Sequence, residues 1–208
     1  MAKPFRVVGI GLNKTGTTSL KLALTELGWR HMKRTPRLFK HWRQGNLDAL
    51  FAEAEAFESF EDWPWPLAFR EAYARWGDGA RYILTRRKSP EAWVESLKRH
   101  ALRTPPDRNP RKRIFGHDYP HGKEAEHIVF YQSHLEEVRA FFAAPERRPL
   151  FAELSWDDGD GWAELCAFLR EQAPDLPFPH GNRALSDAEI APEILAENRR
   201  RIALQTGG

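Results

Sequence analysis

The spacing of apolar residues along the chain predicts strands that alternate with helices. Short apolar runs between polar stretches indicate strands, whereas apolar residues three or four positions apart indicate helices with one buried face. The predicted strands span about residues 5–10, 29–32, 57–60, 80–85 and 150–154. The predicted helices span about residues 17–27, 47–54, 64–76, 90–100, 124–142, 162–169 and 186–204. This alternation predicts an α/β fold with a parallel sheet.

Several residues mark the predicted helix ends. Gly28 follows the first helix, at a position where glycine commonly terminates a helix. Ser89 and Pro90 predict an N-cap followed by a proline in the first helical turn. Asp157 or Asp158 is predicted to cap the penultimate helix.

Residues 7–20, VVGIGLNKTGTTSL, predict a strand, a glycine loop and a helix. The backbone N–H groups of such a loop and of the first helical turn form an anion site. Gly11 and Gly16 keep the spacing of the nucleotide-triphosphate loop G-x-x-x-x-G-K-[ST], but Thr17 stands where the lysine belongs. The lysine, Lys14, comes two positions before the second glycine, where it also replaces the third glycine of the dinucleotide-binding pattern. The loop therefore predicts a phosphate site with a displaced lysine.

Polar groups also follow two other predicted strands. Asp62 comes directly after the strand near residues 57–60, and the basic run Arg86, Arg87 and Lys88 follows the strand at 80–85. Ligands of parallel α/β sheets bind beyond the carboxyl ends of the strands. The glycine loop, the aspartate and the basic run are therefore expected at one site.

Composition indicates a folded domain. The chain has 208 residues, of which 41% are apolar and 29% charged, and it has no internal repeat or strong linker, so we expect a single domain over residues 1–208. The apolar runs are far shorter than the ~20 residues that span a bilayer, so no membrane span is expected. The first residues leave no room for a signal peptide. Cys166 is the one cysteine, which excludes an internal disulfide and favours a reducing, cytoplasmic location.

Basic residues cluster around Pro105, Pro106 and Pro110. The net charge is +3, which suits an anionic ligand as well as many ordinary surfaces. The cluster is either a solvated basic loop or a flap that attracts an anionic cosubstrate or acceptor. No nucleic-acid-binding module accompanies it, so nucleic acid is not an expected partner. Its members are Lys98, Arg99, Arg103, Arg108, Arg111, Lys112 and Arg113.

Four segments together resemble the P-loop sulfotransferases, which use 3′-phosphoadenosine 5′-phosphosulfate (PAPS). Residues 14–19, KTGTTS, are similar to the family's 5′-phosphosulfate loop, in which the lysine precedes the glycine. Residues 82–87, YILTRR, with Pro90, Trp93 and Ser96, are similar to its 3′-phosphate segment. Two further runs resemble a compact, bacterial-type subgroup: Glu61-Asp62-Trp63-Pro64, and Gly161-Trp162 through Pro177-Phe178-Pro179-His180-Gly181-Asn182. The resemblance implies a three-layer fold like that of the P-loop nucleoside-triphosphate hydrolases.

The resemblance implies a transferase with PAPS as cosubstrate, 3′-phosphoadenosine 5′-phosphate (PAP) as product and no required metal. A sulfuryl group carries less charge than a terminal phosphoryl group, so positioning and hydrogen-bond donors suffice for its transfer. Lys14 would neutralise charge on the oxygen that bridges sulfur and the leaving 5′-phosphate. Gly16 would let the backbone approach, and Thr17 and Thr18 would donate to the 5′-phosphate. Thr15 and Ser19 complete the predicted loop contacts.

The residue for the 3′-phosphate is ambiguous between two neighbours. Counting forward from the strand favours Arg87, whereas counting back from Ser96 favours Lys88. We prefer Arg87, because a guanidinium offers phosphate a bidentate fork. Ser96 is predicted to donate its hydroxyl to the same phosphate, although a serine within a helix is commonly just solvated.

An acceptor hydroxyl or amine must lose a proton, so a general base is expected near the loop. Asp62 is the first candidate, with Glu61 and His100 as alternatives. The alternative interpretation of Asp62 is a cap on a helix that begins near Pro64. The acceptor is predicted to be a small molecule or another substrate, of unidentified structure.

Other interpretations fit some of the same residues. Tyr131 and His134 also resemble the subgroup, but such a pair within a helix is commonly packing. Trp63 and Trp65 are interpreted as core residues that could line an acceptor pocket. A P-loop kinase that uses ATP and magnesium is the alternative enzyme, with Asp62 as the metal ligand. A non-catalytic protein that binds PAP or another nucleotide is the third possibility.

Overall fold

The computed structural model describes residues 3–33, 35–105, 107, 109–181 and 190–207. The chain divides into two compact units. Met1–Lys88 and Val138–Asn182 form the first, which we call the sheet unit; Ser89–Glu137 and Arg183–Gly208 form the second, the helical unit. The single domain over residues 1–208 stays a prediction.

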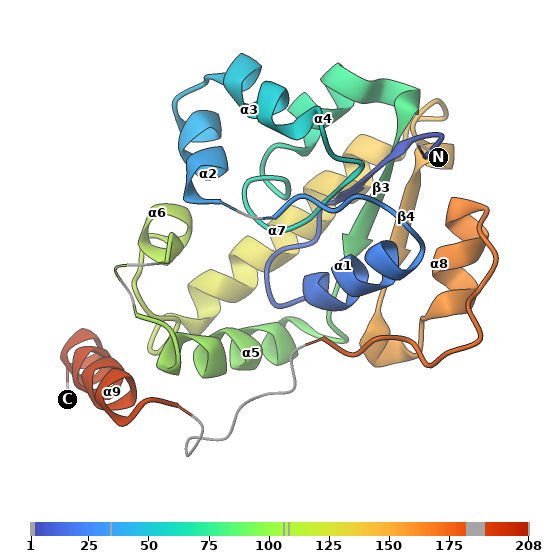
Figure 1. The fold of residues 1–208 in the computed structure, drawn as a ribbon. Helices are drawn as coiled ribbons and strands as arrows, with labels where there is room; N and C mark the ends of the chain where they lie inside the picture. Colours follow the sequence, from blue (N-terminus) through green and yellow to red (C-terminus); the bar gives the residue numbers. More distant parts are fainter. Residues whose placement is uncertain (1–2, 34, 106, 108, 182–189, 208) are drawn as a thin grey trace. The chain divides into compact units, whose positions relative to one another are not determined.

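The sheet unit is built on four parallel strands in the order β2-β1-β3-β4 (Figure 1). Their bounds are Arg6–Gly9 for β1, Ser59–Phe60 for β2, Ala80–Thr85 for β3 and Phe151–Leu154 for β4. The predicted α/β fold with a parallel sheet is thus confirmed. The strand predicted at 29–32 is reduced to a single bridge between His31 and Ser59, because β2 offers only two residues for pairing.

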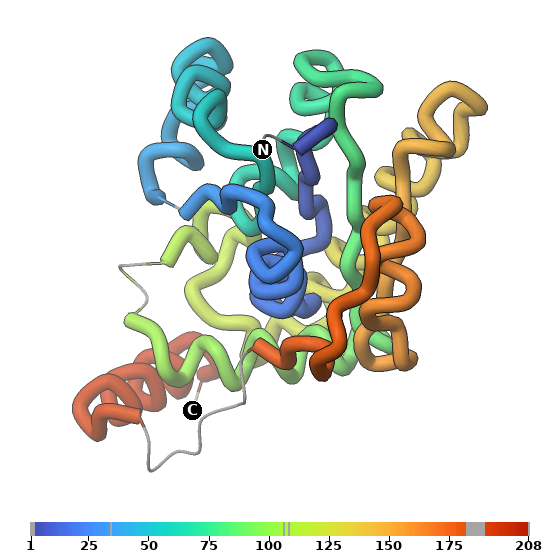
Figure 2. The backbone as a smooth tube through the Cα atoms, turned by 45° about the vertical axis from the view of Figure 1, so that its right-hand side comes forward, coloured from blue at the N-terminus to red at the C-terminus, as the bar shows by residue number. Residues whose placement is uncertain are grey.

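Helices cover both faces of this sheet. One face of the sheet packs against α1 (Thr17–Glu26) and α8 (Trp162–Leu169). It presents Val7 of β1, Ile83 of β3 and Leu154 of β4. Figures 1 and 2 show these two helices on the same side of the strands. Tyr82 points to the opposite face, where its ring lies 5.0 Å from Phe142 at the end of α7 and 6.0 Å from Tyr73 of α4 (Phe69–Trp76). This arrangement confirms the flanked sheet.

Some predicted elements differ from those in the structure. Helix α4 begins at Phe69 rather than near residue 64, because turns occupy the preceding residues and Trp65 N–H donates to the Asp62 carbonyl. Two helices were not predicted, α2 (Pro36–Arg43) and α6 (Arg111–Phe115). In α2 only Leu38 and Phe39 are buried, so its apolar pattern is weak. Helix α3 (Leu47–Ala54) agrees with the prediction.

The predicted cap of α8 was wrong. Gly161 is the N-cap, and its N–H donates to Glu164 Oε2 at 2.8 Å. Asp157 and Asp158 lie earlier, in the 3₁₀ turn η4 (Trp156–Asp158). Their carboxylates pair with arginines after β3, which stabilises them more than a helix N-terminus several residues away.

The helical unit contains α5 (Pro90–Leu102), α6, most of α7 (Glu124–Phe142) and α9 (Pro192–Thr206). Ser89 caps α5 as predicted, because its Oγ accepts from Ala92 N–H at 3.2 Å. Trp93 stacks on Tyr131 with ring centroids 4.8 Å apart. That contact assigns Tyr131 to packing. No described helix is both long and apolar enough to cross a membrane.

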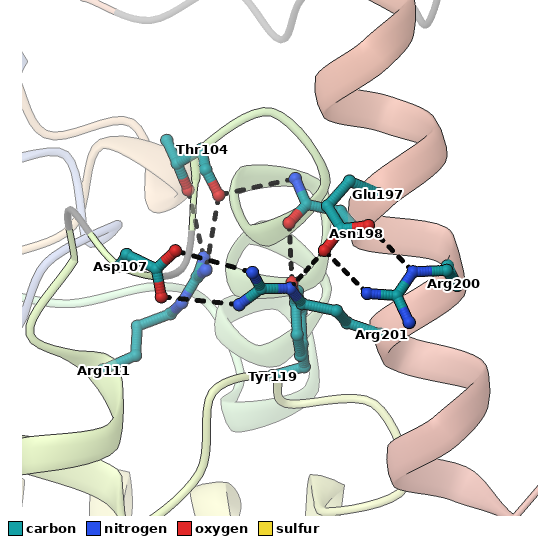
Figure 3. A network of polar contacts seen from close by, with 8 residues as sticks. All are labelled: Thr104, Asp107, Arg111, Tyr119, Glu197, Asn198, Arg200 and Arg201. Atoms are coloured by element: carbon teal, nitrogen blue, oxygen red, sulfur yellow. Dashed lines mark hydrogen bonds and ion pairs between the residues drawn. The ribbon is translucent and has the colours of Figure 1, made fainter.

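A buried polar network ties α9 to the rest of the helical unit (Figure 3). Asn198 is 1% exposed; its amide donates to the Leu102 carbonyl at 2.7 Å and accepts from the Tyr119 hydroxyl at 2.7 Å. Arg111, also buried, donates to Thr104 Oγ1 at 3.0 Å. Burial lowers the pKa of Arg111 below the ordinary value, without neutralising it at pH 7. Each of these side chains thus makes hydrogen bonds within the protein in place of those that it would make with water.

Replacing Asn198 with alanine is expected to lower the free energy of unfolding by about 1–3 kcal/mol, because the Tyr119 hydroxyl and the Leu102 carbonyl lose their buried partner. Urea unfolding followed by circular dichroism measures the change. Arg200→Ala on the same helix is the control, since Arg200 is exposed and pairs with Glu197, and it should shift stability by no more than about 0.5 kcal/mol. Equal effects of the two substitutions would contradict the buried role of Asn198.

Candidate functional site

The loop between β1 and α1 has the backbone shape of an anion cradle. Lys14 and Gly16 both adopt left-handed conformations, with φ of 69° and 95°. Left-handed residues in such a loop help to turn backbone N–H groups toward one concave side. Helix α1 then begins at Thr17 with no side-chain cap and no acidic residue in its first turn. Its N-terminal N–H groups and positive dipole end therefore suit an anion.

Thr15 fastens this loop to the neighbouring strand. Its buried hydroxyl donates to the Leu12 carbonyl at 2.6 Å and lies 2.7 Å from the Thr85 hydroxyl, at the end of β3. Gly11 packs against the same residue: a Cβ there would lie 2.4 Å from the Thr85 carbonyl oxygen. Both contacts of the Thr15 hydroxyl are with protein groups, so the ligand contact predicted for Thr15 would come from its backbone. That contact stays a prediction.

Trp156 closes the loop from the η4 turn. Its indole Nε1–H donates to the Gly16 carbonyl at 3.1 Å, and a Cβ on Gly16 would lie only 2.1 Å from the indole Cδ1. The ring also packs against Phe178, with centroids 4.6 Å apart. No contact between Trp156 and the loop was predicted. Its separation from the loop along the chain leaves no local signal of this contact.

The end of the C-terminal run, the segment from Gly161 that resembles the compact sulfotransferase subgroup, contacts the first turn of α1. The Gly181 N–H donates to Ser19 Oγ at 2.9 Å, and a Cβ on Gly181 would lie 2.6 Å from Thr18 Cγ2. Figure 2 shows the segment after α8 returning alongside α1. Asn182, which was part of the predicted run, lies outside the described residues, as do Arg108 of the basic cluster and Ser186 of the last helix.

The residues predicted for the 3′-phosphate follow β3 directly. Arg87 Nε lies 2.6 Å from Asp157 Oδ2, which also accepts from the backbone N–H of Lys88 at 3.1 Å. The Lys88 side chain is exposed and that of Arg87 half-buried. Ser96, which is 9% exposed on α5, belongs to the helical unit. The choice between Arg87 and Lys88 stays a prediction.

A second arginine, Arg86, connects the end of β3 to β4 and to the η4 turn. Arg86 lies 2.8 Å from Glu153 Oε1 on β4 and 2.7 Å from Asp158 Oδ2. The Ser155 hydroxyl and the Arg86 guanidinium lower the pKa of Asp158. The pKa of Glu153 is also lowered, chiefly by its hydrogen bond from Arg139. Both carboxylates therefore stay ionised at neutral pH, and Arg86 links β3 to β4.

The candidate bases follow β2. Asp62 has a left-handed backbone with φ of 62°, and its Oδ1 accepts from Trp63 N–H at 2.8 Å. It does not cap a helix near Pro64, because α4 starts at Phe69. Trp63 and Trp65 are buried, as the core interpretation predicts.

Glu61 lies beside the start of the glycine loop. A Cβ on Gly9, the last residue of β1, would lie 3.3 Å from Glu61 Cβ. The Glu61 Oε1 is 3.8 Å from His31 Nε2, and His31 Nδ1 lies 2.9 Å from Ser59 Oγ. The side chains of Glu61 and His31 are 11% and 5% exposed. His31 was not among the predicted site residues, although it falls within the predicted strand 29–32.

The remaining candidates lie in the helical unit. His100 is on α5, and Tyr131 and His134 are on α7. The role of His100 as a base stays a prediction. Among the residues that the structure describes, no group of three or more His, Cys, Asp or Glu side chains could hold a metal ion.

Comparison with known proteins agrees with this geometry. The family model described as a sulfotransferase domain matches residues 6–111 and 108–186, which include the glycine loop, the residues after β2 and β3, and the C-terminal run. The chain is also similar to the Ava biosynthesis cluster protein M of Aspergillus versicolor, with 25% identity over an alignment 218 residues long; the match covers 84% of this chain and 80% of that protein. The chain therefore belongs to the sulfotransferase domain family.

Proposed function

We propose that this protein transfers a sulfuryl group from PAPS to a hydroxyl or amine of a small-molecule acceptor. The observation that carries the proposal is the loop itself. Lys14 and Gly16 give it the left-handed turns of an anion cradle, and α1 follows with an uncapped N-terminus. Membership of the sulfotransferase family supports transfer of sulfur-containing groups rather than phosphoryl transfer from ATP.

The loop residues would bind the 5′ end of the cosubstrate. When bound, PAPS supplies a sulfuryl group attached to a 5′-phosphate leaving group. Thr17 and Thr18, at the start of α1, would donate hydrogen bonds to that phosphate, and Gly16 would let the backbone approach it. Lys14 would neutralise the charge that develops on the bridging oxygen. Ser19, whose hydroxyl accepts from Gly181, would hold the C-terminal run over the loop.

Arg87 would bind the 3′-phosphate, with Lys88 as the alternative and Ser96 as a further donor. The side chain of Arg87 is half-buried at the end of β3, whereas that of Lys88 is exposed. A guanidinium also offers a phosphate two parallel hydrogen bonds, which an ammonium group does not. Both considerations support Arg87.

Asp62 would act as the general base, with Glu61 and His100 as alternatives. Asp62 and Glu61 follow β2, which neighbours the β1 strand that leads into the loop. Carboxyl ends of neighbouring parallel strands meet at one edge of a sheet, so these carboxylates lie on the loop's side. A base there would accept the acceptor's proton as the oxygen–sulfur or nitrogen–sulfur bond forms. A cytoplasmic location is part of this proposal.

Calorimetric titration with PAP, followed by transfer assays with ³⁵S-labelled PAPS over a panel of alcohols, phenols and amines, tests the function. We expect PAP to bind without added magnesium and label to move to at least one acceptor. Binding without any transfer would favour a non-catalytic nucleotide-binding protein. Magnesium-dependent ATP turnover with no PAP binding would instead establish a kinase.

A further inference from the structure

Asp157 occupies hydrogen-bond donors that a phosphate would use. Its Oδ2 accepts from Arg87 Nε at 2.6 Å and from the Lys88 backbone N–H at 3.1 Å. A guanidinium N–H and a main-chain N–H are the donor types that commonly bind phosphate oxygens. The carboxylate therefore stands where an anionic ligand of Arg87 would make its contacts.

The neighbouring arginine is held in a different way. Arg86 contacts Glu153 at 2.8 Å and Asp158 at 2.7 Å, and Glu153 also contacts Arg139 at 2.7 Å. Glu153 belongs to β4, so Arg86 is part of the connection between adjacent strands. Arg87 pairs instead with a carboxylate on the η4 turn. Its side chain and that of Asp157 are each 25% exposed, which leaves room for exchange with a solute.

The backbone beside Asp157 is anchored. Trp156, the preceding residue, donates to the Gly16 carbonyl at 3.1 Å and packs on Phe178. The η4 turn is therefore held against the glycine loop, and rotation of the Asp157 side chain is the smallest movement that releases Arg87. Such a rotation takes place within picoseconds to nanoseconds for an exposed side chain, so it would not delay binding.

We propose that Asp157 is an internal competitor for the 3′-phosphate: its carboxylate holds Arg87 and the Lys88 N–H until a 3′-phosphate displaces it, and it returns as PAP leaves. This inference rests on the proposed function, because it takes Arg87 as the 3′-phosphate residue. A phosphate dianion has more charge and more acceptor oxygens than a carboxylate, so it can displace one. The competition weakens product binding and speeds its release, a step that limits turnover in many enzymes.

The test compares two nucleotides that differ only in the 3′-phosphate. Calorimetry would measure the Kd of PAP and of adenosine 5′-phosphate for the wild type, Asp157→Asn and the matched control Asp158→Asn. We expect Asp157→Asn to bind PAP about fivefold more tightly or better, as the loss of one competing charge–charge contact implies. Adenosine 5′-phosphate should bind within twofold of the wild type, and Asp158→Asn should leave both constants within twofold. In an Arg87→Ala background, the gain from Asp157→Asn should disappear.

Several results would overturn the proposal. If Asp157→Asn binds PAP as the wild type does or more weakly, Asp157 supports Arg87 rather than competing with its ligand. An equal gain for both nucleotides would assign the effect to the general field of a removed charge. Asp157→Ser provides a second variant of the same charge change and must move the PAP constant in the same direction. If the wild type binds no PAP, the proposed function itself fails and this inference fails with it, a result that differs from all the others.

Discussion

Replacing Lys14 with alanine is expected to lower the rate of sulfuryl transfer by about 100-fold or more, because removal of one donor that stabilises transition-state charge commonly has that effect. The initial rate of ³⁵S transfer from labelled PAPS measures the change. PAP lacks the sulfuryl group, so its Kd should rise by no more than about tenfold, or about 1.4 kcal/mol. A loss concentrated in the rate identifies a role in the transition state.

Lys14 already has a left-handed backbone, and alanine there has the same Cβ, so the substitution adds no backbone strain. Lys21→Ala is the matched control, since Lys21 lies in α1, the helix that follows the loop, and its substitution removes the same charge. It should leave the transfer rate within about twofold of the wild type, as expected for a screened charge away from the reacting atoms. Activity of Lys14→Ala within threefold of the wild type would show that the lysine does not act on the leaving group.

Replacing Gly16 with alanine is expected to lower the free energy of unfolding by about 2–5 kcal/mol and to weaken PAP binding. Two effects add at this position. A left-handed conformation, with φ of 95°, costs a residue with a Cβ about 1–2 kcal/mol. The new Cβ would also lie 2.1 Å from Trp156 Cδ1, and overpacking of this kind costs about 1–3 kcal/mol. Urea unfolding and PAP calorimetry measure the two consequences.

Gly45→Ala separates these effects. Gly45 has a φ of 67°, but a Cβ there meets nothing within 4 Å, so its replacement should cost the backbone term of about 1–2 kcal/mol alone. The double variant Gly16→Ala with Trp156→Ala removes the clash and should be more stable than the sum of its single variants implies, by at least about 0.5 kcal/mol. If Gly16→Ala destabilises no more than Gly45→Ala, the indole does not constrain the loop.

Much of the fold follows from local pattern. Strand β3 and helix α7 lie within a residue of their predicted bounds, since apolar periodicity reports which side of an element is buried. The short β2 was predicted two residues too long at its start and the basic helix α2 was not predicted, because two residues or two buried side chains give little periodicity. The cap predicted at Asp157 or Asp158 failed for a different reason. Cap propensity is local, whereas the arginines that hold these carboxylates come from another strand.

The sequence by itself determined the α/β alternation, the glycine loop with its displaced lysine, and the helix that follows the loop. These features rest on neighbouring residues, on glycine conformation and on periodicity, all of which can be read along the chain. Only the tertiary structure decided what surrounds the loop. Trp156 reaches Gly16 across 140 positions and Gly181 reaches Ser19 across 162, while Asp157 reaches Arg87. These pairs depend on the strand order that sets β4 beside β3, and no local pattern encodes that order.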